Sequence, residues 1–176
     1  GGYNEYNLEG LEKFYDKVPL FLRRGIGNIT KNLPYFKGKH TILKYSKPLE
    51  ERYYNKTEMF LSEDAQAILK PKYKTDLSPF DLCTPYYDEV KGKDDVQRKM
   101  YIDLNFWLPN DILLKADKMS MANSVELRVP FLDKEVWKLS QKIPTKYMIR
   151  DGQTKYIFRR IADEKIPEEW AKRKKK

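Results

Sequence analysis

Apolar side chains recur at intervals of three and four residues along most of this chain, which is the spacing of amphipathic helices. The strongest such stretch starts at the acidic pair Asp94–Asp95, a typical helix start signal. Pro109 is expected to interrupt it, with a second helical stretch continuing to about Met121. The apolar face of the stretch before Pro109 is formed by four residues at spacings of four, four and three: Val96, Met100, Leu104 and Trp107.

Capping residues and prolines mark further helices. Ser78 is expected at an N-cap, with Pro79 as the first helical residue and Asp81 as the acidic residue that completes the cap. Asp133 is expected to cap a later helix, which Pro144 ends. The remaining candidates cover residues 8–19, 20–32, 39–45, 48–54, 63–69 and 154–163, with a short helix after Pro167 and a turn at Asp151–Gly152.

Little of the sequence shows the alternating pattern of a β-strand. Residues 125–129 alternate between apolar and charged side chains until Pro130, so this segment is expected to be extended rather than part of a sheet. There is no βαβ alternation and no G-x-x-x-x-G-K-[ST] phosphate loop. We therefore predict an all-α, multi-helical fold that forms a single domain over residues 1–176.

The chain carries 35 basic and 26 acidic residues, a formal net charge of +9. Such a surface attracts anions, including nucleic acid and phosphorylated small molecules. A basic helical module that binds nucleic acid or serves in assembly is therefore an alternative function. Part of the excess lies in residues 172–176, where a solvated tail is the usual explanation.

Cys83 is the only cysteine in this sequence, and His40 is the only histidine. One thiol and one imidazole cannot form a thiol-and-imidazole metal cluster, so no metal site is expected. A lone cysteine fits a reducing compartment, and we expect a cytoplasmic protein. The sequence has no run of 18 apolar residues, so no membrane span is predicted. The chain does not begin with Met, and we expect it to be part of a longer protein.

One segment is far more specific. Residues 108–133 read LPNDILLKADKMSMANSVELRVPFLD. This segment resembles the signature of the glutamine-dependent asparagine synthetase family, which runs from Leu-Pro through Lys-x-Asp-Arg-x-Ser-Met to Glu-x-Arg-x-Pro-Phe-Leu-Asp. Lys118 stands where the family usually has Arg. The matching positions are Asp111, Lys115, Asp117, Ser120, Met121, Glu126, Arg128, Pro130, Phe131 and Asp133.

Three more segments resemble the same family in the expected order. Residues 152–159, GQTKYIFR, are similar to its Gly-x-x-Lys-x-x-Leu-Arg helix. Residues 166–175, IPEEWAKRKK, are similar to its Leu-Pro segment with a late Arg-x-Lys, and residues 1–3 to the end of its Gly-Ala-Asp-Glu-x-Phe-Gly-Gly-Tyr loop. The specific resemblance covers residues 96–175, whereas residues 4–95 agree in helical character alone.

The resemblance implies an enzyme with two coupled sites. A glutaminase domain releases ammonia, and the synthetase domain uses ATP and Mg²⁺ to convert aspartate into an aspartyl-adenylate, which ammonia attacks to give asparagine. This chain would be the C-terminal helical part of that α/β, ATP-pyrophosphatase-like domain. The family's Ser-Gly-Gly-x-Asp-Ser loop is absent from the sequence. We therefore expect the fragment alone to be inactive and to bind neither ATP nor Mg²⁺. A related amidotransferase acting on another carboxylate is a further alternative.

The resemblance also selects site residues. Lys155 matches the family lysine taken to contact the ATP phosphates, and its alternative is an ordinary solvated lysine. Glu126 and Arg128 share one side of an extended run, and either line the substrate cleft or bridge two helices. Lys115 and Asp117 face different sides of a helix. We favour structural support for Asp117, for instance by pairing with a cation such as Arg128.

Arg173 matches a late arginine of the family, near an end of the chain that we expect to fray. The expected partners are the rest of the same chain, with its upstream sheet and glutaminase domain, and the small molecules aspartate, ATP and glutamine. Neither a membrane nor nucleic acid is expected as a partner of that enzyme, and a homo-oligomer is considered. Helices that face the parent's sheet would expose apolar surface in the fragment, so we expect it to self-associate.

Overall fold

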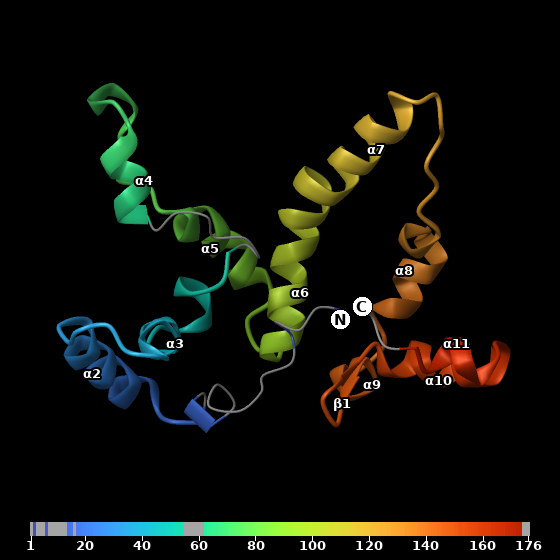
Figure 1. Ribbon diagram of the computed structural model, residues 1–176, viewed down its shortest axis with the longest axis horizontal. Coiled ribbons are helices and arrows are strands. Elements are labelled where there is room, and N and C mark those ends of the chain that lie inside the picture. Colours follow the sequence, from blue (N-terminus) through green and yellow to red (C-terminus); the bar gives the residue numbers. More distant parts are fainter. Residues whose placement is uncertain (1, 3–5, 7–13, 16, 55–61, 174–176) are drawn as a thin grey trace. The chain divides into compact units, whose positions relative to one another are not determined.

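The computed structural model of this protein describes residues 2, 6, 14–15, 17–54 and 62–173, and nearly all of its regular structure is helical (Figure 1). Two compact units are formed, one by residues 10–125 and one by residues 1–9 together with residues 126–176. The α-helices are α2 (Leu20–Lys31), α3 (Lys39–Tyr45), α4 (Ser62–Ile68), α5 (Pro79–Glu89), α6 (Asp95–Asn105), α7 (Leu114–Met121), α8 (Lys134–Ser140), α9 (Thr145–Met148), α10 (Tyr156–Lys165) and α11 (Glu168–Ala171). Shorter helical segments are η2 (Leu49–Glu51), η3 (Pro71–Tyr73), η4 (Leu108–Leu113) and η5 (Pro130–Leu132).

The prediction of a helical fold is confirmed, with one small addition. Strands β1 (Ile149–Arg150) and β2 (Gln153–Thr154) form an antiparallel hairpin in which Ile149 pairs with Thr154. The sequence indicated the turn between them but not the strands, because two residues are too few to show a period of two. The segment 125–129 is extended and outside any sheet, as expected.

The core of the 10–125 unit lies where η2, α5 and α6 meet. Its fully buried members come from all three elements and from the residues just after η2: Leu49, Tyr53, Cys83, Tyr87 and Ile102. The aromatic rings of Tyr86 and Phe106 pack edge to face beside it, with centroids 4.8 Å apart. Apolar packing therefore holds together α5 and α6, which follow each other in the sequence.

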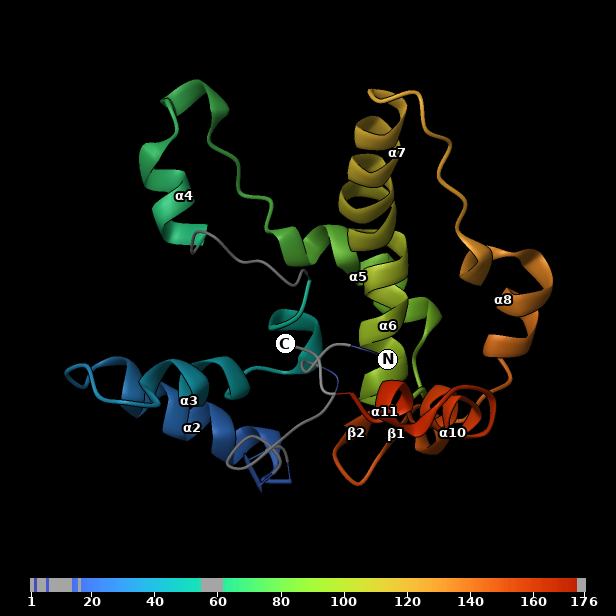
Figure 2. The ribbon, with the colours of Figure 1, turned by 45° about the vertical axis from the view of Figure 1, so that its right-hand side comes forward.

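α2 and α3 form a second packed pair in the same unit and lie side by side in both views (Figures 1 and 2). Gly27 allows the close approach, since a Cβ at that position would overlap the Ser46 side chain. Arg23 Nη1 also donates to the Tyr45 carbonyl at 3.2 Å. On α2, Phe21 and Ile29 remain about 70% exposed (73% and 69%), which agrees with the expected apolar surface.

The predicted helix caps of α5, α6 and α8 are confirmed. At α5, Ser78 Oγ accepts from the Phe80 amide at 3.2 Å, while Asp81 accepts from the Ser78 amide at 2.7 Å. Asp94 accepts from the Gln97 amide at 3.0 Å at the start of α6. Asp133 accepts from two amides of α8, at 2.9 and 3.3 Å. Each cap satisfies amides that have no partner inside their helix.

The predicted interruption at Pro109 is confirmed: α6 ends at Asn105, and α-helical geometry resumes in α7, which ends at Met121. Residues 108–113 form a π-helix, η4, that joins α6 to α7 along one continuous ribbon (Figure 1). Proline cannot donate the backbone bond that an α-helix requires, and its ring crowds the preceding turn. A local widening to π geometry accommodates both defects, so the α-helix is interrupted by a π segment and not by a loop.

Other element boundaries differ from the sequence expectation. The helix expected over residues 48–54 is a single turn, η2, because the chain leaves helical geometry to bury Tyr53. α8 stops at Ser140, before Pro144, which instead precedes α9. α10 begins at Tyr156 because residues 153–154 belong to β2. The helix expected over residues 8–19 falls largely outside the described residues. None of the described helices is long and apolar enough to cross a membrane.

Candidate functional site

The β1–β2 hairpin fixes the backbone that leads into Lys155. Its two-residue turn is Asp151–Gly152, and both residues have positive φ, 50° and 75°. That combination matches the type I′ turn, whose twist suits a two-residue hairpin. Lys155 follows β2 immediately and also adopts a left-handed conformation, with φ 57° and ψ 33°. A non-glycine residue rarely takes this conformation, so the surrounding structure must hold it.

Contacts from α10 hold Lys155 in place. Arg159 Nε donates to the Thr154 carbonyl at 3.1 Å, and the Arg159 amide donates to the Lys155 carbonyl at 3.0 Å. Lys155 is the N-cap residue of α10, and no side chain caps this end of the helix. Its own side chain is exposed and lies beside Gly2. The backbone of Lys155 therefore lies at a helix N-terminus whose amides and dipole favour anions.

Arg150 adds positive charge to the same hairpin. Its guanidinium lies over the Tyr156 ring, with Cζ 5.3 Å from the centroid, and Nη1 is 3.4 Å from the Tyr156 hydroxyl. Asp151 pairs with the Arg150 Nε at 3.5 Å and offsets part of its charge. Sequence analysis did not select Arg150, since an arginine in a short unrecognised strand carries no distinguishing pattern.

Glu126 and Arg128 are brought together as the extended run predicted. Arg128 Nη2 lies 2.7 Å from Glu126 Oε1, with both side chains largely exposed. A solvent-exposed ion pair of this kind contributes little to stability. Further along, Phe131 packs edge to face on Phe158 of α10, with centroids 5.4 Å apart, and so joins the segment after Arg128 to the helix that follows Lys155. The choice between cleft lining and helix bridging for the pair stays a prediction.

Lys115 and Asp117 both lie on α7, in the other unit. Lys115 Nζ pairs with Asp111 Oδ1 at 2.7 Å, one turn earlier. The Asp117 carbonyl accepts a bond from Ser120 Oγ at 3.1 Å. Arg128 has Glu126 as its ion-pair partner in its own unit, and a pairing between Asp117 and Arg128 stays a prediction.

Arg173 lies just after α11. Its amide donates to the Trp170 carbonyl at 3.3 Å, and its guanidinium carbon is 5.7 Å from the Trp170 ring centroid. The side chain is thus within cation–π distance of an aromatic ring. Its role in a site stays a prediction.

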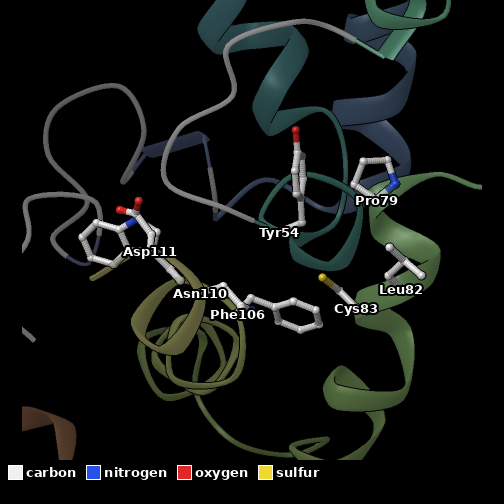
Figure 3. A pocket seen from close by; sticks show the side chains of 8 residues that line it. Tyr54, Pro79, Leu82, Cys83, Phe106, Asn110 and Asp111 are labelled. Carbon is white, nitrogen blue, oxygen red and sulfur yellow. The ribbon is translucent and has the colours of Figure 1, made fainter. Parts of the chain in front are cut away.

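A cavity of about 320 Å³ opens in the 10–125 unit between α5 and the α6–η4 junction (Figure 3). Its walls are mostly apolar, with Asn110 and Asp111 at one side: Tyr54, Pro79, Leu82, Cys83, Phe106, Trp107, Asn110 and Asp111. Burial raises the pKa of the Cys83 thiol, which therefore stays protonated at neutral pH and is a poor nucleophile. Sequence analysis did not predict this cavity, because its walls come from segments far apart in the chain.

The comparisons with known proteins identify the class of protein. The family model described as asparagine synthase matches residues 1–176, so the chain belongs to the asparagine synthase family. Asparagine synthetase [glutamine-hydrolyzing] 1 of Bacillus subtilis (strain 168) is 37% identical over 176 residues, which is 99% of this chain and 28% of the relative. A putative asparagine synthetase [glutamine-hydrolyzing] of Mycobacterium bovis (strain ATCC BAA-935 / AF2122/97) is 40% identical over 168 residues, 95% of this chain and 26% of the relative.

The chain therefore spans little more than a quarter of the length of these relatives (28% and 26%). No solved structure matches it. The family match extends the resemblance to residues 4–95, where the sequence had offered helical character alone. The family to which the chain belongs consists of ATP-using ligases.

Proposed function

We propose that this chain is the C-terminal helical part of the synthetase domain of a glutamine-dependent asparagine synthetase. In that enzyme ATP would activate the side-chain carboxylate of aspartate as an acyl-adenylate, releasing pyrophosphate. Ammonia derived from glutamine would then attack the acyl carbon and release AMP, giving asparagine. The family match over residues 1–176 carries this proposal, and the relatives named as glutamine-hydrolysing asparagine synthetases support glutamine as the nitrogen source.

Lys155 is proposed to hold the phosphates of ATP and to stabilise charge that develops on pyrophosphate. A carboxylate is a poor electrophile, so the reaction depends on making pyrophosphate a good leaving group. The location of Lys155 at the uncapped N-terminus of α10, with Arg150 on the adjoining hairpin, supports that role. The left-handed backbone of Lys155 supports it further, because strained conformations concentrate at functional sites.

Mg²⁺ is proposed to accompany ATP and to neutralise its phosphates. Within the described part of the chain, no group of three His, Cys, Asp or Glu side chains is arranged to hold a metal ion. We propose that the phosphates of ATP and the remainder of the parent enzyme supply the Mg²⁺ ligands. Glu126 and Arg128 are proposed to line the substrate cleft, Asp117 and Lys115 to support it, and Arg173 to lie at its edge.

The fragment alone is proposed to be inactive, because no Ser-Gly-Gly sequence is present to form the family's pyrophosphate loop. Its natural partner would be the rest of its own chain, including the sheet that these helices cover and the glutaminase domain. The parent enzyme is proposed to act in the cytoplasm, where aspartate, ATP and glutamine are available.

ATP–pyrophosphate exchange in the full-length parent enzyme tests this proposal, since exchange reports adenylation without the ammonia step. We expect exchange that depends on aspartate, and a fall of about 10²–10³-fold for Lys155→Met, as for the loss of one charge-stabilising donor. Lys165→Met, at the other end of α10, is the matched control and should retain exchange. Exchange supported by a different carboxylate would instead identify a related amidotransferase, and normal exchange in Lys155→Met would exclude the role of Lys155.

A further inference from the structure

Gly2 lies against the side chain of Lys155 within the same unit. A Cβ built on Gly2 would overlap Cε of Lys155 and would lie 3.4 Å from Nζ and 3.5 Å from Cδ. Any residue larger than glycine at this position must therefore push the lysine side chain aside. The two residues are far apart in sequence, so nothing in the local pattern around Lys155 reveals this contact.

The need for glycine comes from space and not from the backbone. The described glycines with positive φ are Gly38, Gly92 and Gly152, and Gly2 is not among them. An alanine could therefore adopt the Gly2 backbone conformation without strain. The atoms that it would meet belong to the flexible end of a long side chain. A Gly2→Ala protein should consequently fold normally while holding the Lys155 ammonium elsewhere.

The backbone of Lys155 cannot move to compensate. Its carbonyl accepts from the Arg159 amide at 3.0 Å, and the preceding carbonyl of Thr154 accepts from Arg159 Nε at 3.1 Å. The left-handed φ of 57° also lies in a narrow allowed region. Displacement is thus taken up by the side-chain torsions of Lys155, which move Nζ more than any other atom.

We propose that Gly2 is a positioning residue for Lys155: its missing side chain leaves the space that the end of the lysine side chain occupies, and so sets where the ammonium lies. This inference rests on the proposed role of Lys155 at the phosphates of ATP. Gly2 does not itself touch the reacting atoms in this proposal. Its contribution is the location of one ammonium group, and misplacement of a catalytic group by about 1 Å can lower a rate by about a hundredfold.

The test uses the full-length parent enzyme and ATP–pyrophosphate exchange with aspartate. Gly2→Ala should lower kcat by about tenfold to a hundredfold and change KM for ATP much less, because the interaction matters most as charge develops in the transition state. Gly25→Ala is the matched control, since no atom lies within 4 Å of a Cβ built there. Neither variant should lower the Tm or the glutaminase activity, whereas a general folding defect would lower both.

A double-mutant cycle separates this inference from the proposed function. In a Lys155→Met background, Gly2→Ala should cause no further loss. An equal loss in both backgrounds, or no loss with Lys155 present, would overturn the role of Gly2 while leaving that of Lys155 intact. Normal exchange in Lys155→Met would instead refute the proposed role of Lys155, and exchange that does not depend on aspartate would refute the proposed function.

The contact can also be measured without catalysis. The rate at which acetic anhydride acetylates Lys155, followed by mass spectrometry, should change in Gly2→Ala and remain constant in Gly25→Ala. An unchanged rate in Gly2→Ala would overturn the inference whatever Lys155 does.

Discussion

The hydroxyl of Tyr53 donates to both carboxylate oxygens of Asp103, each at 2.9 Å, and joins residues 50 positions apart. Both side chains are buried. The Tyr53 carbonyl in turn accepts from the Tyr87 hydroxyl at 2.6 Å. Hydrogen bonds inside the core therefore connect α5, α6 and the segment that follows η2. A carboxylate buried at this depth depends on such donors, because removing charge from water is costly.

Tyr53→Phe should therefore loosen α6. Loss of a donor to a buried carboxylate should lower the free energy of opening by about 1–3 kcal/mol. Amide hydrogen exchange of α6 in the full-length protein measures this opening. Tyr73→Phe is the control, since the Tyr73 side chain is 61% exposed. Equal protection of α6 in the two variants would contradict a stabilising role for the Tyr53–Asp103 bond.

The same core should lose stability at alkaline pH. Burial raises the pKa of both Cys83 and Tyr87 above their ordinary values. The unfolded chain thus releases these protons first, and the stabilisation is complete below about pH 8.5 and declines as pH rises further. The urea midpoint between pH 7 and pH 11 measures the decline, and Cys83→Ala should make it shallower. A urea midpoint that rises with pH over this range would contradict this prediction.

Two glycines of α2 should respond in opposite directions to alanine. Gly27→Ala would overlap the Ser46 side chain and should destabilise the α2–α3 pair by about 1–3 kcal/mol. Gly25→Ala meets no atom within 4 Å and should stabilise the helix by about 0.5–1 kcal/mol. Hydrogen exchange of α2 distinguishes them, and a stabilising Gly27→Ala would show that the two helices are less closely packed.

Lys155→Gly should raise stability while abolishing function. Glycine takes a left-handed conformation without the cost of about 1–2 kcal/mol that an L-residue carries there. The hairpin and α10 should accordingly become more resistant to exchange with solvent, while ATP–pyrophosphate exchange is lost. Lys155→Asn, which tolerates this conformation but has no charge, provides a second variant. Retained catalytic exchange in either variant would show that the lysine is not held there for chemistry.

The isolated chain should self-associate through its apolar surface. Phe21 and Ile29 on α2 are 73% and 69% exposed, and Phe131 near α8 is 66% exposed. Sedimentation velocity should show species larger than 21.1 kDa, and Phe21→Lys with Ile29→Lys should shift them toward the monomer. Lys31→Ser with Lys44→Ser, which leaves the apolar side chains intact, is the control. A monomeric wild-type chain would contradict this expectation.

Sequence reasoning succeeded where a single local interaction decides the structure. Ser78, Asp94 and Asp133 each cap a helix because a short polar side chain can reach nearby amides. It failed where distant packing decides. Tyr53 suits a helix by its spacing, yet burial against α6 ends the helical turn before it.

The candidate site was predictable only in part. Lys155 followed from its family resemblance, and the pairing of Glu126 with Arg128 followed from their spacing in an extended run. The left-handed backbone of Lys155 and its contact with Gly2 were not predictable, since both depend on the hairpin and on segments far apart in sequence. Residues at a distance leave no periodic signal that a single sequence can reveal.

Continuity across η4 has a mechanical consequence. Residues 95–121 follow one helical path through α6, η4 and α7, which changes direction between α6 and α7 (Figure 1). Its first half is anchored in the core through Ile102 and Asp103, whereas its far end presents Ser120 and Met121. A tilt at the anchored end therefore becomes a larger displacement at the far end. The first part of the family signature, which starts at Leu108, lies beyond the anchored half of this path. Small rearrangements around Tyr53 would therefore move it.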